Sequence, residues 1–410
     1  MKHMLIAQSG GPSAAINATV AGVVERCLTS DKVDRIYGAV NGIKGVLNGN
    51  YVDLTEILSS PEQLRLLCST PAAALGSCRL KLNNADEGQL GQIVDALLSR
   101  EIGYFVYIGG NDSMDTVYQL SAYIKKHNIQ GLSVMGAPKT IDNDLPMTDH
   151  CPGFGSAAKY IAATFAEIVR DCEVYDIPAV TIVEVMGRNA GWLTAASVLA
   201  RKFELDNPVL IYLPEADFEL EQFAKDLRAA LEKQNSVVVC VSEGISDASG
   251  TFICEYGDEA MVDNFGHKML TGCGKVLENF IRHRFGVKVR SVELNVNQRC
   301  SGMLASETDI EEAAEAGQKG VEAAVAGETG KMVAFERVQT EPYRMECRLV
   351  DVNEVCNLEK KVPLEWITGH GSDVGQEFLD YARPLIKGEP KRPMEDGIPK
   401  YLYRNGGFTV

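Results

Sequence analysis

Short apolar runs alternate along the chain with longer amphipathic stretches. Six runs of four to six residues are rich in Val and Ile, and most are followed closely by Gly, Pro or Ser, a pattern typical of buried parallel strands. The predicted strands are Met4–Ala7, Tyr104–Ile108, Leu132–Ala137, Val180–Val185, Val209–Leu213 and Val237–Val241.

Helices are predicted between these strands, where the apolar positions follow a helical period. They are Ala14–Leu28, Ser113–Lys126, Gly155–Asp171, Asn189–Arg201, Leu220–Glu232, Gly274–Phe285 and Glu311–Ala326. Alternation of strands and helices indicates βαβ units, in which helices cover both faces of a parallel sheet. The break Cys151-Pro152-Gly153 suggests a domain boundary near residue 153, and the Pro-rich tail after Gly330 is less regular.

Composition narrows the class of protein. The chain has 410 residues, of which 45% are hydrophobic, and this suits two α/β domains or one large domain with insertions. A formal net charge of −16 gives no general attraction for nucleic acid or an anionic membrane. The 11 cysteines are scattered without a CxxC pair, as expected of reduced thiols. With no signal-peptide pattern and no long apolar span, we expect a cytoplasmic protein.

Ligands of such folds bind at the carboxyl ends of the strands, and polar or glycine-rich clusters follow several predicted strands here. The first is Ser9-Gly10-Gly11-Pro12-Ser13, whose glycines allow close approach of the backbone to an anion such as phosphate. A tight turn between strand and helix would explain the same residues. The second, Gly109-Gly110-Asn111-Asp112-Ser113, offers oxygen ligands that suit Mg²⁺, although Asp or Ser also commonly opens a helix.

The sharpest cluster is Pro138-Lys139-Thr140-Ile141-Asp142-Asn143-Asp144. One carboxylate there can accept a proton from an attacking hydroxyl, the other can help to place a cation, and the lysine can hold phosphate oxygens. A solvated loop with a surface ion pair is the alternative. Together with the glycine turns, this pattern favours phosphoryl transfer, which depends on positioning and charge neutralisation.

Several arginines are candidates for binding phosphate. Arg188 in Met186-Gly187-Arg188 follows a predicted strand, and an arginine there can grip a sugar phosphate with two hydrogen bonds. Arg79 follows a loop of small residues, and Arg290 and Arg299 flank the short run Ser291–Gln298. A structural or surface role is the alternative for each of them.

These motifs, in this order, resemble the phosphofructokinase family over residues 5 to about 300, and the string Thr140-Ile141-Asp142-Asn143-Asp144 is highly specific. The resemblance implies an α/β fold of two Rossmann-like parallel-sheet domains with the active site in the cleft between them. Residues 1–153 and about 298–365 would bind the phosphoryl donor, and residues 154–297 with the C-terminal tail would bind the sugar phosphate. It also implies Mg²⁺ and a homodimer or homotetramer.

The resemblance implies transfer of a phosphoryl group from the donor to the 1-hydroxyl of fructose 6-phosphate, and it assigns roles in this reaction to individual residues. Asp142 matches the proton acceptor, and the other catalytic candidates are Lys139 and Asp112. Gly10, Gly11 and Arg79 match the donor-binding positions, and Asn111 and Asp144 are the candidate metal ligands. The substrate-binding candidates are Thr140, Asp142, Met186, Gly187, Arg188, Glu243, Arg290 and Arg299.

Asp112 and Lys139 bear on the phosphoryl donor. Members that use ATP usually carry Gly at the position of Asp112, whereas members that use pyrophosphate usually carry Asp there and Lys at the position of Lys139. A carboxylate at Asp112 would crowd and repel the α-phosphate of a nucleotide, whereas Lys139 can stabilise leaving phosphate. We therefore expect a reversible, glycolytic, pyrophosphate-dependent phosphotransferase. The alternatives are an ATP-dependent 6-phosphofructokinase and a catalytically inactive regulatory homologue that binds sugar phosphates.

Three positions depart from the family pattern. Asn111 stands where Asp is usual, and an amide oxygen can still ligate a cation but brings no charge. Asn295-Val296 replaces a Gly-His pair, and Ala179 replaces an arginine that many members supply from the neighbouring subunit. These changes leave sedoheptulose 7-phosphate open as a second substrate.

Overall fold

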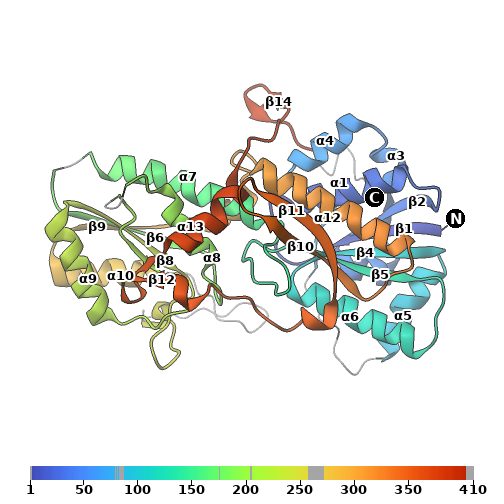
Figure 1. Cartoon of the computed structure of the whole chain (residues 1–410), viewed down its shortest axis with the longest axis horizontal. Helices are drawn as coiled ribbons and strands as arrows, with labels where there is room; N and C mark the ends of the chain where they lie inside the picture. Colours follow the sequence, from blue (N-terminus) through green and yellow to red (C-terminus); the bar gives the residue numbers. More distant parts are fainter. Residues whose placement is uncertain are drawn as a thin grey trace. The chain divides into compact units, whose positions relative to one another are not determined.

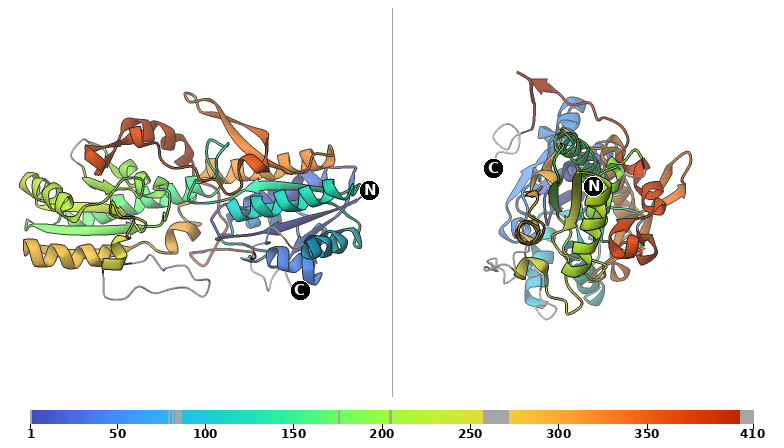
Figure 2. Two further views of the ribbon diagram at one scale, coloured as in Figure 1. Left: turned by 90° about the horizontal axis from the view of Figure 1, so that it is seen from below. Right: turned by 90° about the vertical axis from the view of Figure 1, so that its left-hand side faces the viewer.

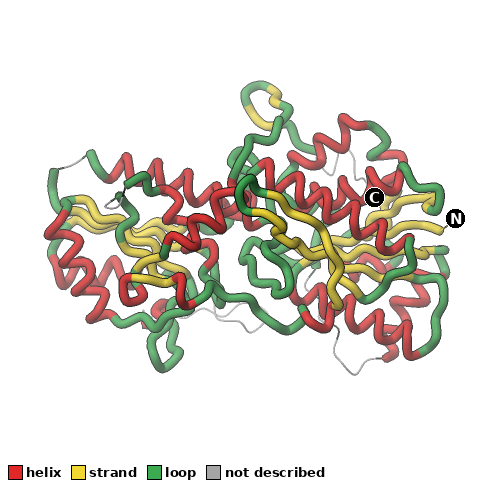
Figure 3. Tube along the Cα trace, viewed as in Figure 1, coloured by secondary structure: helices red, strands yellow, loops and turns green. Residues whose placement is uncertain are grey.

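The strands of the protein form two main sheets, one in each of two units (Figure 3). The structure is a computed structural model that describes residues 2–78, 80, 82, 87–174, 176–203, 206–256 and 272–402. Unit 1 comprises the residues up to Ser156, Arg299–Glu359 and the chain from Ile386 on, and unit 2 comprises Ala157–Gln298 and Lys360–Leu385. The predicted α/β class is confirmed.

Unit 1 is built on a seven-stranded sheet in the order β11-β10-β5-β4-β1-β2-β3. The strands β1, β2, β4, β5 and β10 run parallel to one another, whereas β3 and β11 are antiparallel strands at the two edges. Their bounds are β1 (Lys2–Gln8), β2 (Val33–Ala39), β3 (Tyr51–Asp53), β4 (Ile102–Gly109), β5 (Ser133–Pro138), β10 (Lys331–Gln339) and β11 (Arg344–Asp351).

Both faces of this sheet are apolar and covered by helices (Figure 1). Phe105 and Tyr107 of β4 belong to the cluster with α2 (Gly42–Asn48), α5 (Glu87–Leu98) and α6 (Asn111–Lys126). Val106 and Ile108 belong to the opposite cluster, because successive strand side chains point to opposite faces. The helices of that face are α1 (Ile16–Leu28), α3 (Leu54–Ile57), α4 (Pro61–Ser69) and α12 (Glu307–Val325).

Helices α1 and α12 pack closely because two glycines lie at their contact. A Cβ added to Gly22 would lie 2.0 Å from the carbonyl oxygen of Ala314, and one added to Gly317 would lie 2.2 Å from that of Thr19. The backbones therefore touch where any larger residue would push the helices apart.

The hairpin of β10 and β11 leaves the sheet beyond its first residues. Only Lys331 and Met332 of β10 pair with β5, whereas the rest of β10 pairs with β11 alone. The far end of the hairpin projects from the sheet of unit 1 (Figure 2). One of its residues, Phe335, instead makes backbone contacts to the loop that follows β5.

Unit 2 has a four-stranded, wholly parallel sheet in the order β7-β8-β6-β9. Its strands are β6 (Ala179–Val185), β7 (Leu210–Tyr212), β8 (Ser236–Ser242) and β9 (Lys288–Glu293). Side chains of α9 (Leu220–Lys233) and α10 (Cys273–Phe285) form its main apolar cluster with these strands. The remaining α-helices are α7 (Phe154–Cys172), which begins at the end of unit 1, α8 (Trp192–Ala195), α11 (Asn297–Cys300) and α13 (Gln376–Ala382).

The tail after Gly330 divides between the two units, whereas the sequence analysis placed the end of the chain with the second domain. Trp192 of unit 2 packs against Trp366 and Tyr381, with ring centroids 6.0 and 5.2 Å apart. Beyond Ile386 the chain returns to unit 1, where the Lys387 carbonyl accepts hydrogen bonds from the start of α12, including one of 3.0 Å from Oγ of the N-cap residue Ser306. Short elements of the tail and loops are η1 (Ala196–Ala200), η2 (Ile253–Tyr256), η3 (Val352–Glu354), η4 (Leu364–Trp366), η5 (Gly369–Gly371), η6 (Arg383–Ile386), β12 (Ile367–Thr368), β13 (Asp373–Val374), β14 (Met394–Glu395) and β15 (Ile398–Pro399).

All six predicted strands and all seven predicted helices are present, although the region of Asn189–Arg201 is the short helix α8 followed by η1. None of the eleven cysteines, all of which the structure describes, forms a disulfide. Among the helices that the structure describes, none has the length and apolar character needed to cross a bilayer.

Candidate active site

The glycine turn after β1 holds the ammonium group of Lys139 in unit 1. Gly10 has a φ of +76°, a conformation that favours glycine, and a Cβ there would lie 3.2 Å from Lys139 Nζ. Lys139 Nζ donates a hydrogen bond of 2.6 Å to the carbonyl oxygen of Gly11. The lysine follows β5 directly, and its backbone N–H donates to the Gly109 carbonyl at the end of β4. The predicted clusters after β1 and after β5 thus meet at the carboxyl ends of the strands.

Lys139 is nearly inaccessible, with 4% of its surface exposed. Burial lowers its pKa to about 8 because the ammonium loses its hydration, while the carboxylates of Asp142 and Asp144 partly offset this effect. A buried cation beside the backbone of a glycine turn is a suitable partner for phosphate oxygens. Their negative charge would compensate the ammonium charge, which water no longer solvates.

The loop after Lys139 is held in one conformation by local hydrogen bonds. Asp142 N–H donates to Thr140 Oγ1 at 3.1 Å. Asn143 adopts a left-handed φ of 55°, and its buried Oδ1 accepts from the Cys151 N–H at 2.9 Å. Asparagine tolerates this conformation better than most residues. The two carboxylates on either side of Asn143 are therefore presented from a fixed turn.

Asp144 has the features of a cation ligand. Burial raises the pKa of its carboxyl, and Thr140 hydrogen-bonds to it. Its Oδ1 is buried and has no hydrogen-bond partner among the described residues. Within the same residues, no three His, Cys, Asp or Glu side chains gather to hold a metal alone. The carboxylate oxygen of Asp144 that has no partner among the described residues suits Mg²⁺, which usually takes one or two carboxylates and shares the phosphates of a substrate.

Asn111 and Asp112 open helix α6 but face different surroundings. The Asn111 side chain donates to the Leu358 carbonyl and accepts from the Asn357 N–H, so both ends of its amide are engaged by the backbone. Asp112 is exposed in the first turn of the helix. The Asp112 carboxylate, which we predict to discriminate between donors, is thus accessible, whereas the amide of Asn111 binds the backbone of the segment before residue 360. Its assignment as a metal ligand stays a prediction.

Arg299 lies with the glycine turn, although the sequence analysis grouped it with the sugar-phosphate residues. Its Nη1 would be 3.7 Å from a Cβ on Gly11, and its charge contributes to lowering the pKa of Lys139. It therefore adds a second cation to the cluster of Gly11 and Lys139. Arg79, the other arginine predicted for the donor, lies outside the described residues.

Unit 2 brings its predicted residues together at the carboxyl ends of two neighbouring strands. Val185 of β6 pairs with Ser242 of β8, so Met186-Gly187-Arg188 and Glu243 follow side by side. Gly187 N–H donates to Glu243 Oε1 at 3.3 Å, and burial raises the pKa of that carboxyl. Arg188 is exposed at this edge, where an anionic ligand can reach it.

Gln298 belongs to this second cluster but escaped the sequence analysis. Its Oε1 accepts a hydrogen bond of 3.1 Å from the Met186 N–H, and its Nε2 donates to the Asn295 carbonyl. The side chain is buried. Gln298 belongs to no recognisable sequence motif and carries no charge. Its position between Asn295 and Arg299 was the one feature of the sequence that could have indicated a role.

Arg290 is not part of that cluster. It lies within β9 opposite Thr181, five residues before Met186 along the neighbouring strand, and this corresponds to roughly 16 Å. Its guanidinium is bonded to Asp171 at 2.8 Å. The structure therefore separates Arg290 from the other sugar-phosphate candidates within one chain.

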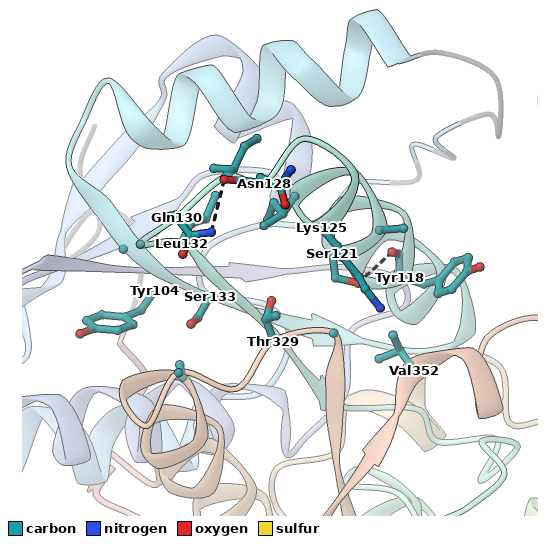
Figure 4. A pocket seen from close by; sticks show the side chains of 18 of the residues that line it. Tyr104, Tyr118, Ser121, Lys125, Asn128, Gln130, Leu132, Ser133, Thr329 and Val352 are labelled. Carbon is teal, nitrogen blue, oxygen red and sulfur yellow. Dashed lines mark hydrogen bonds between the residues drawn. The ribbon is translucent and has the colours of Figure 1, made fainter.

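A cavity of about 980 Å³ lies at the amino ends of strands β4 and β5 in unit 1 (Figure 4). Its lining includes Tyr104 and Ser133, at the starts of β4 and β5, and Lys125 and Tyr118 of α6. Because the candidate catalytic residues follow the ends of the same strands, this cavity is separate from them, and we assign it no role.

Comparison with known proteins identifies the family. The model of the family described as phosphofructokinase matches residues 3–324. The chain belongs to the phosphofructokinase family. The resemblance predicted from the motifs is thereby confirmed.

Individual relatives extend this result to nearly the whole chain. It is 39% identical over 409 residues to the pyrophosphate–fructose 6-phosphate 1-phosphotransferase of Methylococcus capsulatus, covering 98% of this chain and 95% of the relative. It is 38% identical to the protein of the same name from Halomonas elongata, covering 96% and 94%. The crystal structure of a pyrophosphate-dependent phosphofructokinase from Nitrosospira multiformis superposes with a TM-score of 0.88 at 35% identity, covering 98% and 96%.

Proposed function

We propose that this protein catalyses the reversible, Mg²⁺-dependent transfer of a phosphoryl group from pyrophosphate to the 1-hydroxyl of fructose 6-phosphate. The observation that carries the proposal is the buried ammonium of Lys139 on the Gly10-Gly11 turn, next to a helix that carries Asp112 in its first turn. The names of the similar full-length proteins support the same donor and acceptor.

Unit 1 supplies the groups for the donor and for the chemistry. Lys139 and Arg299, with the backbone of the glycine turn, would bind pyrophosphate and stabilise the charge on the departing phosphate. Asp142 would take the proton of the attacking hydroxyl. Asp144 would hold Mg²⁺, which neutralises phosphate charge when it is bound. Little covalent chemistry is asked of the protein, because positioned charges account for most of the catalysis.

Unit 2 would supply the sugar-phosphate contacts through Met186, Gly187, Arg188 and Glu243. The exposed guanidinium of Arg188 suits the phosphate, and the carboxylate of Glu243 suits a sugar hydroxyl. A role in glycolysis, a cytoplasmic location and assembly into a homodimer or homotetramer stay predictions. The test of the function is the initial rate with fructose 6-phosphate and each donor in turn: pyrophosphate, ATP and GTP.

Asp112→Gly tests why pyrophosphate is the donor. We expect kcat/KM for pyrophosphate to fall roughly tenfold, equivalent to about 1.4 kcal/mol of transition-state stabilisation, and activity with ATP to become measurable. The matched variant Asp112→Asn removes the charge and keeps the volume, so it should weaken pyrophosphate use without admitting ATP. An unchanged rate with pyrophosphate in both variants would contradict the role of Asp112.

A further inference from the structure

His150 lies buried at the end of the loop that carries Asp142, with both ring nitrogens bonded to carboxylates. Its Nδ1 is 2.9 Å from Asp149 Oδ2, and its Nε2 is 2.7 Å from Glu312 Oε2 of helix α12. About 1% of its surface is exposed. A neutral imidazole can donate only one hydrogen bond, whereas an imidazolium donates two. Two ionised carboxylate partners are therefore both satisfied only by the charged form.

The two carboxylates are themselves held by the β10–β11 hairpin. Arg337 of β10 donates to Asp149 Oδ2 through Nη2 at 2.8 Å and Nε at 3.2 Å. Tyr343, at the tip of the hairpin, donates to Glu312 Oε1 at 2.6 Å. The Arg337 guanidinium also lies over the Tyr343 ring, 5.2 Å from its centroid. The histidine is thus the centre of a network that joins the loop, α12 and the hairpin.

Backbone hydrogen bonds fasten the same loop to the hairpin. Phe335 N–H donates to Thr148 Oγ1 at 2.9 Å, and Asp149 N–H donates to the Phe335 carbonyl at 2.9 Å. Thr148 Oγ1 in turn donates to the His150 carbonyl at 2.8 Å. The ring of His150 lies against that of Phe335, with centroids 4.8 Å apart. Residues 148–150 are therefore tied to the hairpin by hydrogen bonds and by a ring contact.

The charges around His150 favour its protonation. Burial lowers its pKa, but Glu312 and Asp149 outweigh burial and raise the pKa to about 9. Asp309, also on α12, is a further buried carboxylate, and the positive charge of His150 acts to lower its pKa. It accepts hydrogen bonds from the backbone N–H groups of Gly153 and Ser156, which follow the loop. Arg337 is the opposing cation of the group, and Tyr343 is neutral at physiological pH like an ordinary tyrosine, with burial raising its pKa further.

We propose that His150 is a positioning residue: as an imidazolium held between Asp149 and Glu312, it fixes the loop that carries Asp142 against helix α12 and the β10–β11 hairpin. The inference rests on the proposed function, in which Asp142 is the base. Lys139 is anchored separately, on Gly11 and Gly109. Loosening the loop should therefore lower kcat and leave KM for pyrophosphate nearly unchanged.

The test is the pH dependence of kcat in the wild type, Glu312→Gln and Arg337→Gln. In the wild type, measured with saturating pyrophosphate so that the bound anion keeps Lys139 protonated, kcat should fall as the pH rises through the pKa of His150, about 9, because deprotonation breaks one carboxylate contact. Glu312→Gln removes a negative charge, so its alkaline limb should move about one pH unit lower and kcat should fall about tenfold. Arg337→Gln removes a positive charge and should move the limb the other way. The control is Glu346→Gln, the same change in an exposed ion pair on the same hairpin.

A second readout does not depend on turnover. The ¹⁵N resonances of the wild-type histidines, with His150→Gln to assign one of the six, should show His150 protonated on both nitrogens at pH 7.5. A neutral ring at this pH, or an alkaline limb that stays in place in both Glu312→Gln and Arg337→Gln, would overturn the inference in an active enzyme. If the wild type shows no pyrophosphate-dependent turnover, the proposed function itself fails and the positioning role fails with it.

Discussion

Replacing Asp142 with asparagine should lower kcat by about 10²–10⁴-fold, the usual contribution of a general base. Asparagine keeps the size of the side chain and the loop bond from the Asp142 N–H to Thr140 Oγ1, which involves only the backbone of residue 142. It cannot accept the proton of the attacking hydroxyl. KM for pyrophosphate should change little, because the donor is assigned to Lys139 and the glycine turn.

The measurement is steady-state kinetics with both substrates varied, together with the melting temperature. Asp31→Asn, in an exposed turn of unit 1, is the matched control and should behave as the wild type. A loss of less than tenfold in a folded Asp142→Asn protein would contradict the role of Asp142 as the base.

Lys139→Met should have opposite effects on activity and stability. We expect kcat/KM for pyrophosphate to fall about 10²–10³-fold, as for loss of one preorganised donor to developing charge. The folded protein lowers the Lys139 pKa from 10.5 to about 8, and this shift corresponds to about 3 kcal/mol of cost for burying the ammonium. Methionine removes that cost and forfeits the bond to Gly11, worth about 1 kcal/mol.

The sign of the stability effect follows from the pKa. Because the folded-state pKa lies below the unfolded one, the cost applies fully below pH 8 and disappears as the pH rises past 10.5. Lys139→Met should therefore be more stable than the wild type at pH 7 and equal to it, or less stable, near pH 11. Urea unfolding at the two pH values checks this, with the exposed Lys44→Met as control. Lower stability at pH 7 with unchanged activity would show that Lys139 is a structural lysine.

The sequence predicted those parts of the fold that have a strong local pattern. Val237–Val241 is a run of four valines and a cysteine, and it forms the centre of β8. Strand β9 was missed because its sequence, Lys-Val-Arg-Ser-Val-Glu, alternates with charged residues at the edge of the sheet. The hairpin of β10 and β11 was missed for a similar reason, since β11 carries alternating polar residues and pairs on one side only.

The candidate site was predictable where residue type and position after a strand coincide, as for Lys139 and Asp142. Contacts between segments that lie far apart in the sequence could not be predicted. Nothing near Asn111 in the sequence indicates that its amide binds the backbone at Asn357 and Leu358. The pairing of His150 with Glu312 likewise joins residues 162 positions apart. Such contacts depend on the packing of the whole unit, which local patterns do not encode.

The proposed function depends most directly on the identity of the phosphoryl donor. The decisive measurement is the initial rate of phosphorylation of fructose 6-phosphate by the purified wild-type protein with Mg²⁺ and pyrophosphate, ATP or GTP. We predict turnover with pyrophosphate, release of one orthophosphate per sugar bisphosphate formed, and no significant rate with either nucleotide. Turnover with ATP and none with pyrophosphate would contradict it.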